Sequence, residues 1–161
     1  MILIEASPSA YPRGMLALGK KPRAKEEGDL MRFYTKQHPL YCGIDLHARR
    51  MYVCLVSHDG ASVLHRNMQA APAPFLQAIA PSRDGLMVAV ACLFTWDWLA
   101  DLCAAAGMAF VLGHARSRTA IHGGKAKNDK IDSHKIAVLL RGGLLPQASV
   151  YPAPMRATRD L

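Results

Sequence analysis

Two β-rich runs decide the fold of this chain, Tyr41-Cys42-Gly43-Ile44-Asp45 and Met51-Tyr52-Val53-Cys54-Leu55-Val56. A polar turn at His58-Asp59-Gly60 and a third short run, from Ser62 to Arg66, follow them. Runs of this composition that are separated by short polar turns are typical of neighbouring antiparallel strands. Residues 41–66 therefore predict an antiparallel meander.

The rest of the chain predicts helices that alternate with apolar strands. A helix from Phe75 to Ala80 precedes the apolar run 86–90, and a helix from about Thr95 to Ala106 precedes the run 108–112. Runs of this kind suit strands that are buried on both faces, and two of them joined by a helix form a right-handed parallel unit. A further helix is predicted from Ile131 to Arg141. We expect an α/β fold with a mixed five-stranded sheet and flanking helices, an arrangement that resembles ribonuclease H-like domains.

Composition and charge suit one soluble domain with a basic partner surface. The chain has 161 residues, 51% of them hydrophobic, and 20 Lys and Arg against 12 Asp and Glu. A chain near this size buries roughly 70% of its unfolded surface, so a core forms without disulfides or structural metal. Its cysteines form no C-x-x-C pair, and no apolar run reaches the length of a membrane span. We expect a cytoplasmic protein with reduced thiols and no membrane partner.

Residues 1–30 differ from the rest of the chain, because they are rich in Pro and Gly and show neither helical nor strand periodicity. We expect a disordered leader there, and Met31 is an alternative biological start. A basic arm that contacts nucleic acid is the functional alternative for this segment. The folded domain is expected to span residues 31–161.

Asp45 stands at the end of the first apolar strand, in the run Gly43-Ile44-Asp45-Leu46-His47. Ligands of α/β sheets usually bind at strand ends, so this carboxylate is a candidate catalytic group. The alternative is a turn aspartate that only ends the strand. The same run is also compatible with the opening strand of an actin-like ATPase.

Asp129 and Asp132 lie three residues apart at the start of a predicted helix. Positions with this spacing share one helical face, so two carboxylates there can bind one hard cation such as Mg²⁺. The alternative is helix capping, since Asp is favoured at the N-cap and in the first turn. Capping accounts for one aspartate more readily than for two. Carboxylates that converge with Asp45 would repel one another unless a cation neutralised them.

Basic side chains are concentrated around these two aspartates. Residues 116–141 hold seven Lys and Arg against two Asp, a local net charge of +5. Lys and Arg bind phosphates through counterion release, so this concentration favours a nucleic-acid partner over a solvated helix face. The candidate phosphate-binding residues are Arg116, Arg118, Lys125, Lys127, Lys130 and Lys135.

Other candidates carry less weight. A phosphate-binding P-loop is absent, because Ala126 stands where Ser or Thr is needed. His47, His114 and His122 are predicted to be loop residues near the site, suited to hydrogen bonding or phosphate contact rather than to metal ligation. Aromatic residues beside the second helix are expected to pack in the core rather than to stack on bases; these are Phe94, Trp96 and Trp98.

Five separated motifs of the chain belong together in one known pattern. They are Tyr34-Thr35-Lys36-Gln37-His38, Gly43-Ile44-Asp45-Leu46-His47-Ala48-Arg49, Phe94-Thr95-Trp96, residues 122–133 and Met155-Arg156-Ala157-Thr158-Arg159-Asp160-Leu161. In order and spacing these motifs resemble the amino-terminal catalytic domain of insertion sequence 110 family transposases. The resemblance runs from about Met31 to the last residue and implies a RuvC-like fold with a DEDD set of carboxylates that bind Mg²⁺. The first Asp of that set falls on Asp45, and the last two fall on Asp129 and Asp132.

The chain departs from that family pattern in two ways. Ala91 stands where the family places its Glu, and a methyl group cannot ligate a metal; Cys92 beside it is too soft a ligand to prefer Mg²⁺. The family also has a following helical segment and a carboxy-terminal domain with a serine nucleophile, and its members are guided by a structured RNA. This chain ends at Leu161, before either region.

These observations lead to a first hypothesis and two alternatives. The first is a truncated transposase domain, inactive alone, whose partners are DNA, a structured guide RNA, and other copies of itself or a full-length transposase. The second is a non-catalytic nucleic-acid-binding protein derived from a transposase. The third is an actin-like ATPase fragment, which the absence of a second glycine-rich phosphate loop disfavours.

Overall fold

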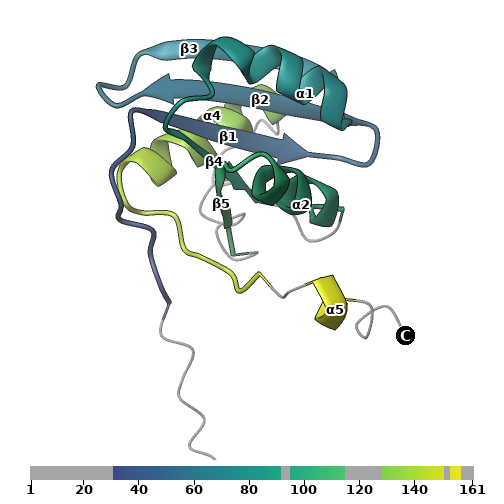
Figure 1. The fold of residues 1–161 in the computed structure, drawn as a ribbon. Helices are drawn as coiled ribbons and strands as arrows, with labels where there is room; N and C mark the ends of the chain where they lie inside the picture. Colours follow the sequence, from purple (N-terminus) through teal and green to yellow (C-terminus); the bar gives the residue numbers. More distant parts are fainter. Residues whose placement is uncertain (1–30, 92–94, 115–127, 151–152, 157–161) are drawn as a thin grey trace, which may run out of the picture. The chain divides into compact units, whose positions relative to one another are not determined.

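The computed structural model describes residues 31–91, 95–114, 128–150 and 153–156, which all lie in the unit Met31–Leu161 (Figure 1). The expected leader 1–30 lies outside the described residues. The strands are β1 (Leu40–Leu46), β2 (Arg50–Ser57), β3 (Ser62–Gln69), β4 (Leu86–Val90) and β5 (Ala109–Leu112). The helices are α1 (Pro72–Ile79), the 3₁₀ turn Ala80–Ser82, α2 (Asp97–Ala105), α4 (Asp129–Arg141) and α5 (Ala153–Arg156).

The five strands form one sheet in the order β3-β2-β1-β4-β5. β1, β2 and β3 pair antiparallel, as the meander predicted, whereas β4 pairs parallel with both β1 and β5. The crossover from β4 to β5 runs through α2. The prediction of a mixed α/β sheet with flanking helices is confirmed.

Alternating side chains of the central strands build a separate apolar cluster on each face of the sheet. Ile44 and Val88 belong to the cluster that also contains Phe75 of α1 and Leu99 of α2. The other cluster includes Tyr41 and Ala89 of the sheet together with Ile136, Ala137 and Leu140 of α4. The sheet therefore lies between α1 and α2 on one side and α4 on the other (Figure 1).

Gly43 lets α4 approach the central strand closely. A Cβ atom at this position would lie 2.2 Å from the carbonyl oxygen of Ser133 and 2.4 Å from the backbone nitrogen of Ala137. Both distances are far below van der Waals contact, so any other residue would push the helix away from β1. Because Asp45 follows two residues along the same strand face, this contact also sets the start of α4 beside it.

The helices of the structure differ from the predicted ranges mainly at their starts. α4 begins at Asp129 rather than Ile131, because the Asn128 side chain caps it. α2 begins at Asp97 rather than Thr95, and Thr95 has a positive φ of 66° that no helical residue adopts. Trp96 is buried in the core, as predicted, and Phe94 lies outside the described residues.

Three of the four cysteines are described, and all are free and buried. Burial raises the pKa of Cys54 to about 11 and that of Cys103 to about 12. These thiols therefore stay protonated and act as small apolar core residues. None of the described helices is long and apolar enough to cross a membrane.

Candidate functional site

Asp45 lies near the carboxyl end of β1, on the face of the sheet that α4 covers. Strand periodicity puts its side chain on the side of Tyr41 and Gly43, both of which face that helix. The side chain is 13% exposed. Asp45 is thus set at the rim of the core, at a strand end, where its carboxylate keeps a path to solvent.

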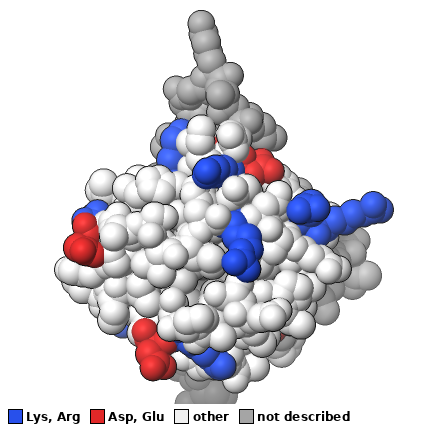
Figure 2. All heavy atoms as spheres, turned by 90° about the horizontal axis from the view of Figure 1, so that it is seen from above, with Lys and Arg blue, Asp and Glu red and all other residues white. Residues whose placement is uncertain are grey.

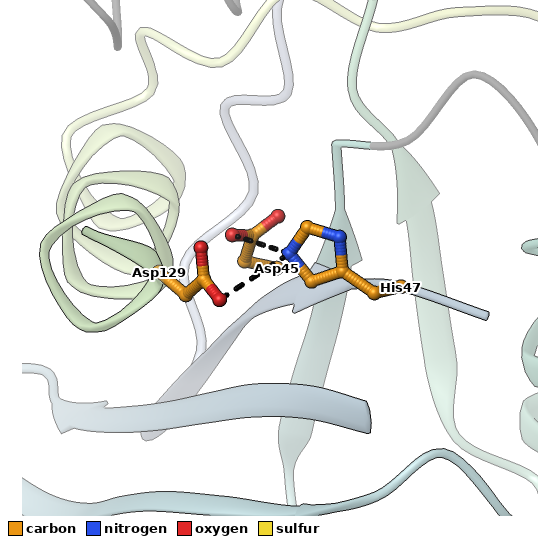
Figure 3. A group of neighbouring side chains, drawn as sticks. All are labelled: Asp45, His47 and Asp129. Carbon is orange, nitrogen blue, oxygen red and sulfur yellow. Dashed lines mark hydrogen bonds and ion pairs between the residues drawn. The ribbon is translucent and has the colours of Figure 1, made fainter. Parts of the chain in front are cut away.

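His47 follows β1 in the short connection to β2. Its backbone N–H donates to the carbonyl of Arg50 at 3.0 Å, which closes the hairpin. The ring lies between two carboxylates: Nε2 is 3.3 Å from Oδ2 of Asp45 and 3.5 Å from Oδ2 of Asp129 (Figure 3). The prediction that His47 makes hydrogen bonds near the site is confirmed by its bond with Asp45.

Asn128, not an aspartate, caps the helix that supplies Asp129. The Asn128 side chain accepts a hydrogen bond from the backbone N–H of Lys130 at 3.0 Å. The backbone carbonyl of Asn128 accepts one from the backbone N–H of Asp132. The N-cap position is therefore not an aspartate. Both aspartates do lie in the first turn of α4, where the positive end of the helix dipole favours them, so this part of the capping alternative is confirmed. Asp129 is left at the first position of α4, where its carboxylate, 47% exposed, turns towards His47 (Figure 3).

The structure brings Asp45, His47 and Asp129 together, with one ligand atom of each within 4.8 Å of the others. Asp132 does not belong to this group of three. Its side chain, 4% exposed, lies one helical turn further along α4 on the inward face. Asp132 is still close enough for its charge to act on Asp45. Two of the three predicted ligands therefore meet directly, and His47 is the third member of the group that the structure brings together.

The pKa of Asp45 is raised above its ordinary value of 3.8. Burial is the main cause, and the charges of Asp129 and Asp132 raise the pKa further, while His47 opposes the shift. The ionised form of Asp45 is thus disfavoured in the absence of a cation. A cation bound beside it would remove part of that penalty.

Asp45→Asn is expected to raise the melting temperature at pH 7 in buffer that contains a chelator. Since the folded state raises the pKa of Asp45, the stability that this group contributes is full below pH 3.8 and is lost as pH rises through the folded pKa. Asn keeps the size and the acceptor oxygen but has no charge. Thermal unfolding measured against pH checks this, with the exposed Asp84→Asn as the matched control. A melting temperature at pH 7 that falls, or moves only as in the control, would contradict it.

Ala91 directly follows β4, beside the candidate site. The last paired positions of the two parallel strands are Ile44 and Val90, so Asp45 and Ala91 come next on neighbouring strands. Ala91 is 6% exposed and belongs to the apolar cluster on the α4 face. A longer acidic side chain at this position would start on the same face as Asp45.

The predicted phosphate-binding residues lie mostly outside the described part of the chain. Arg116, Arg118, Lys125 and Lys127 fall in the stretch 115–127, which is not described, as does His122. Lys130 is exposed on the first turn of α4, and Lys135 is half-buried one turn later. On the face seen from above in Figure 2, the Lys and Arg side chains that are described stand apart on a largely uncharged surface.

Comparison with known proteins identifies the family. A model of the DEDD transposases of insertion sequence 110, described as Transposase, matches residues 42–161. No curated protein matches the chain.

Two solved structures of RuvC from Thermus thermophilus are similar to the chain. RuvC in complex with Holliday junction substrate has 14% identity and a TM-score of 0.51, over 69% of this chain and all of that one. A second RuvC structure has 18% identity and a TM-score of 0.40, over 71% of this chain and 84% of its own.

The first RuvC structure supports the fold that the sequence pattern and the family resemblance predicted, a RuvC-like member of the ribonuclease H-like class. The family match is to a transposase and gives no support to the actin-like ATPase alternative, which we therefore drop. The run that suggested it was Gly43-Ile44-Asp45. In this structure Gly43 allows α4 to pack closely on β1, and Asp45 contributes a carboxylate to the candidate site. With three quarters of its length matched by the family model, the chain belongs to the DEDD transposase family of insertion sequence 110.

Proposed function

We propose that residues 31–161 form the nucleic-acid-binding, RuvC-like domain of a transposase, with a carboxylate centre built from Asp45, Asp129 and Asp132 that holds a divalent cation. The observation that carries this proposal is the meeting of Asp45 and Asp129, from a strand end and a helix start far apart in sequence. Mg²⁺, the cation that the resemblance implies, binds carboxylate oxygens and waters. Such an ion, when bound, stabilises the charge on the attacking and leaving oxygens of phosphoryl transfer.

The residues around the centre position its ligands and its substrate. The hairpin bond at His47 and the Asn128 cap fix the two ligand-bearing backbones, so their carboxylates converge before any substrate arrives. Arg116, Arg118, Lys125 and Lys127 precede α4 in the chain, and Lys130 and Lys135 lie on it. We propose that these cations contact the phosphates of DNA and of a structured guide RNA.

We further propose that the chain does not cleave DNA as it stands. Ala91, beside Asp45, supplies no oxygen to a cation, so the centre lacks one of the four carboxylates of its family. The same observation favours the second candidate, a nucleic-acid-binding protein without catalysis that acts on DNA or on other copies of the transposase. The two candidates share the phosphate contacts and differ in whether the carboxylates are needed.

Nucleic-acid binding by the full chain is expected to weaken steeply with salt. Fluorescence anisotropy with branched DNA and with a structured RNA, over a series of KCl concentrations, gives the slope of log K against log salt. Lys130→Gln with Lys135→Gln should reduce that slope by up to about 1.8, since each phosphate contact contributes about 0.9. Lys36→Gln, an exposed position on another segment, is the control and should leave the slope unchanged.

The dependence of DNA binding on Mg²⁺ and on the carboxylates distinguishes the two candidate functions. In the transposase reading, Asp129→Asn with Asp132→Asn weakens the effect of Mg²⁺ on DNA binding while leaving salt-dependent binding in place. Identical binding with and without Mg²⁺, in both the parent chain and that variant, would support the non-catalytic candidate. A slope near zero in the parent would contradict both candidates.

A further inference from the structure

We infer that the imidazole of His47 is a ligand of the metal centre and makes it select a transition dication of the Zn²⁺ and Co²⁺ class over Mg²⁺. This inference deepens the proposed function, because it concerns the same centre, and it rests on the carboxylates of that centre. It starts from the three side chains that the structure brings together, Asp45, His47 and Asp129. One of their three donor atoms is a ring nitrogen.

The chemistry of the donors argues against a pure magnesium site. Mg²⁺ prefers six oxygen ligands, whereas imidazole nitrogen suits Zn²⁺ and its neighbours in the transition series. Ala91 removes the oxygen donor that would favour Mg²⁺, and His47 adds a nitrogen donor. The donors that meet directly are two carboxylates and one imidazole, while Asp132, the third carboxylate of the proposed centre, lies one turn deeper on α4. Three protein ligands are typical of four-coordinate centres that keep one position open for water.

The spacing of the donors is compatible with one shared ion. Nε2 of His47 is 3.3 Å from the nearer oxygen of Asp45, to which it is hydrogen-bonded, and 3.5 Å from that of Asp129. All three donor atoms lie within 4.8 Å of one another. Ligands that sit about 2.0–2.1 Å from a tetrahedral ion lie roughly 3.3 Å apart, so the ring and both carboxylates can converge on one ion. The choice of ion then rests on the chemistry of the donors.

The donors are carried on hydrogen-bonded backbone, and the centre is open to solvent. His47 is held by the hairpin bond to Arg50, and Asp129 by the capped start of α4, so the donors come from two fixed elements. The side chains of His47 and Asp129 are 43% and 47% exposed, which leaves an ion and a water free to enter. Figure 3 shows the ring of His47, which directly follows the carboxyl end of β1, facing the carboxylates of Asp45 and Asp129.

The test compares Co²⁺ with Mg²⁺ on the full chain after metal is removed with a chelator. Isothermal titration calorimetry gives the two affinities, and visible absorption reports coordination, since four-coordinate Co²⁺ absorbs far more strongly than six-coordinate Co²⁺. We expect the parent to bind Co²⁺ with strong absorption. His47→Ala should lower Co²⁺ affinity at least about tenfold and bleach that absorption, while Mg²⁺ affinity changes less than about twofold.

Two further variants make the result decisive. His58→Ala removes another exposed histidine and should change neither readout, which excludes adventitious binding to surface imidazoles. Asp45→Asn should weaken both metals. If His47→Ala leaves Co²⁺ affinity and absorption unchanged while Asp45→Asn weakens both metals, the inference is overturned and the proposed carboxylate centre stands. If Asp45→Asn affects neither metal, the proposed centre fails as well.

Discussion

Gly43→Ala is expected to destabilise the fold by about 3 kcal/mol, a loss of roughly 6–12 °C in melting temperature for a domain of this size. A methyl group at this position would overlap the carbonyl oxygen of Ser133 and the backbone nitrogen of Ala137. Both atoms belong to the backbone of α4, so no side-chain rotation relieves the overlap. The whole helix has to move outward, and its contacts in the apolar cluster loosen with it.

The consequence extends to the candidate site, because α4 also carries Asp129. Outward movement of the helix would separate Asp129 from Asp45 and His47, so Gly43→Ala should also weaken Co²⁺ binding by the folded protein. Thermal unfolding and metal titration of the same variant measure the two effects together. If the variant loses both stability and Co²⁺ affinity, the geometry of the metal centre depends on how closely α4 packs on β1.

Gly107→Ala is the matched control for this prediction. Gly107 has a φ of +68°, but a Cβ atom there would meet nothing within 4 Å. Alanine at that position is strained only in its backbone, at a cost of about 1 kcal/mol. A loss for Gly43→Ala no larger than that for Gly107→Ala would mean that α4 does not pack on β1 as closely as the structure has it.

The strands were predictable because they depend on local patterns. The continuous apolar run 86–90 appears as β4 with the same bounds, and the β-rich runs around Gly43 and Val53 appear as β1 and β2. Composition is sufficient there, since a strand that is buried on both faces has to be apolar throughout. The close approach at Gly43 was not predictable, because it depends on a helix 90 residues further along the chain.

The candidate site was only partly predictable for a similar reason. Asp45 and Asp129 are marked by their places at a strand end and a helix start, and the structure brings them together. The inward direction of Asp132 depends on how α4 is rotated against the sheet, which helical spacing alone does not fix. His47 was predicted to lie near the site and to form hydrogen bonds rather than to bind a metal. Its position two residues after Asp45, where the chain turns from β1 into β2, is the signal that its ring lies beside that carboxylate.

Ala91→Glu is expected to raise Mg²⁺ affinity by about 10- to 100-fold, the size of effect that single groups around a metal centre commonly have. Position 91 is next to Asp45 on the neighbouring parallel strand, on the face that α4 covers. A glutamate there adds the oxygen donor that a hard, oxygen-preferring ion needs. The same change should reduce the preference for Co²⁺ that we attribute to His47.

The Ala91→Glu protein should be less stable than the parent unless a cation is bound. Position 91 is 6% exposed and close to Asp45, whose pKa is already raised by burial and by two other carboxylates. A further buried carboxylate without a cation should destabilise the metal-free protein by about 2 kcal/mol. Saturating Mg²⁺ should restore much of this, so the rise in melting temperature on adding Mg²⁺ becomes larger in the variant than in the parent.

Ala91→Gln distinguishes the effect of the added negative charge from that of the longer side chain. Glutamine has the same length and brings an amide in place of the carboxylate, so it should disturb the packing near Gly113 and Leu145 without creating a strong ligand. We expect Gln to lower the melting temperature with and without Mg²⁺ by similar amounts. Equal Mg²⁺ affinity in the parent, Glu and Gln forms would mean that position 91 does not face the cation. The absence of the fourth carboxylate would then no longer explain why the chain is expected not to cleave DNA.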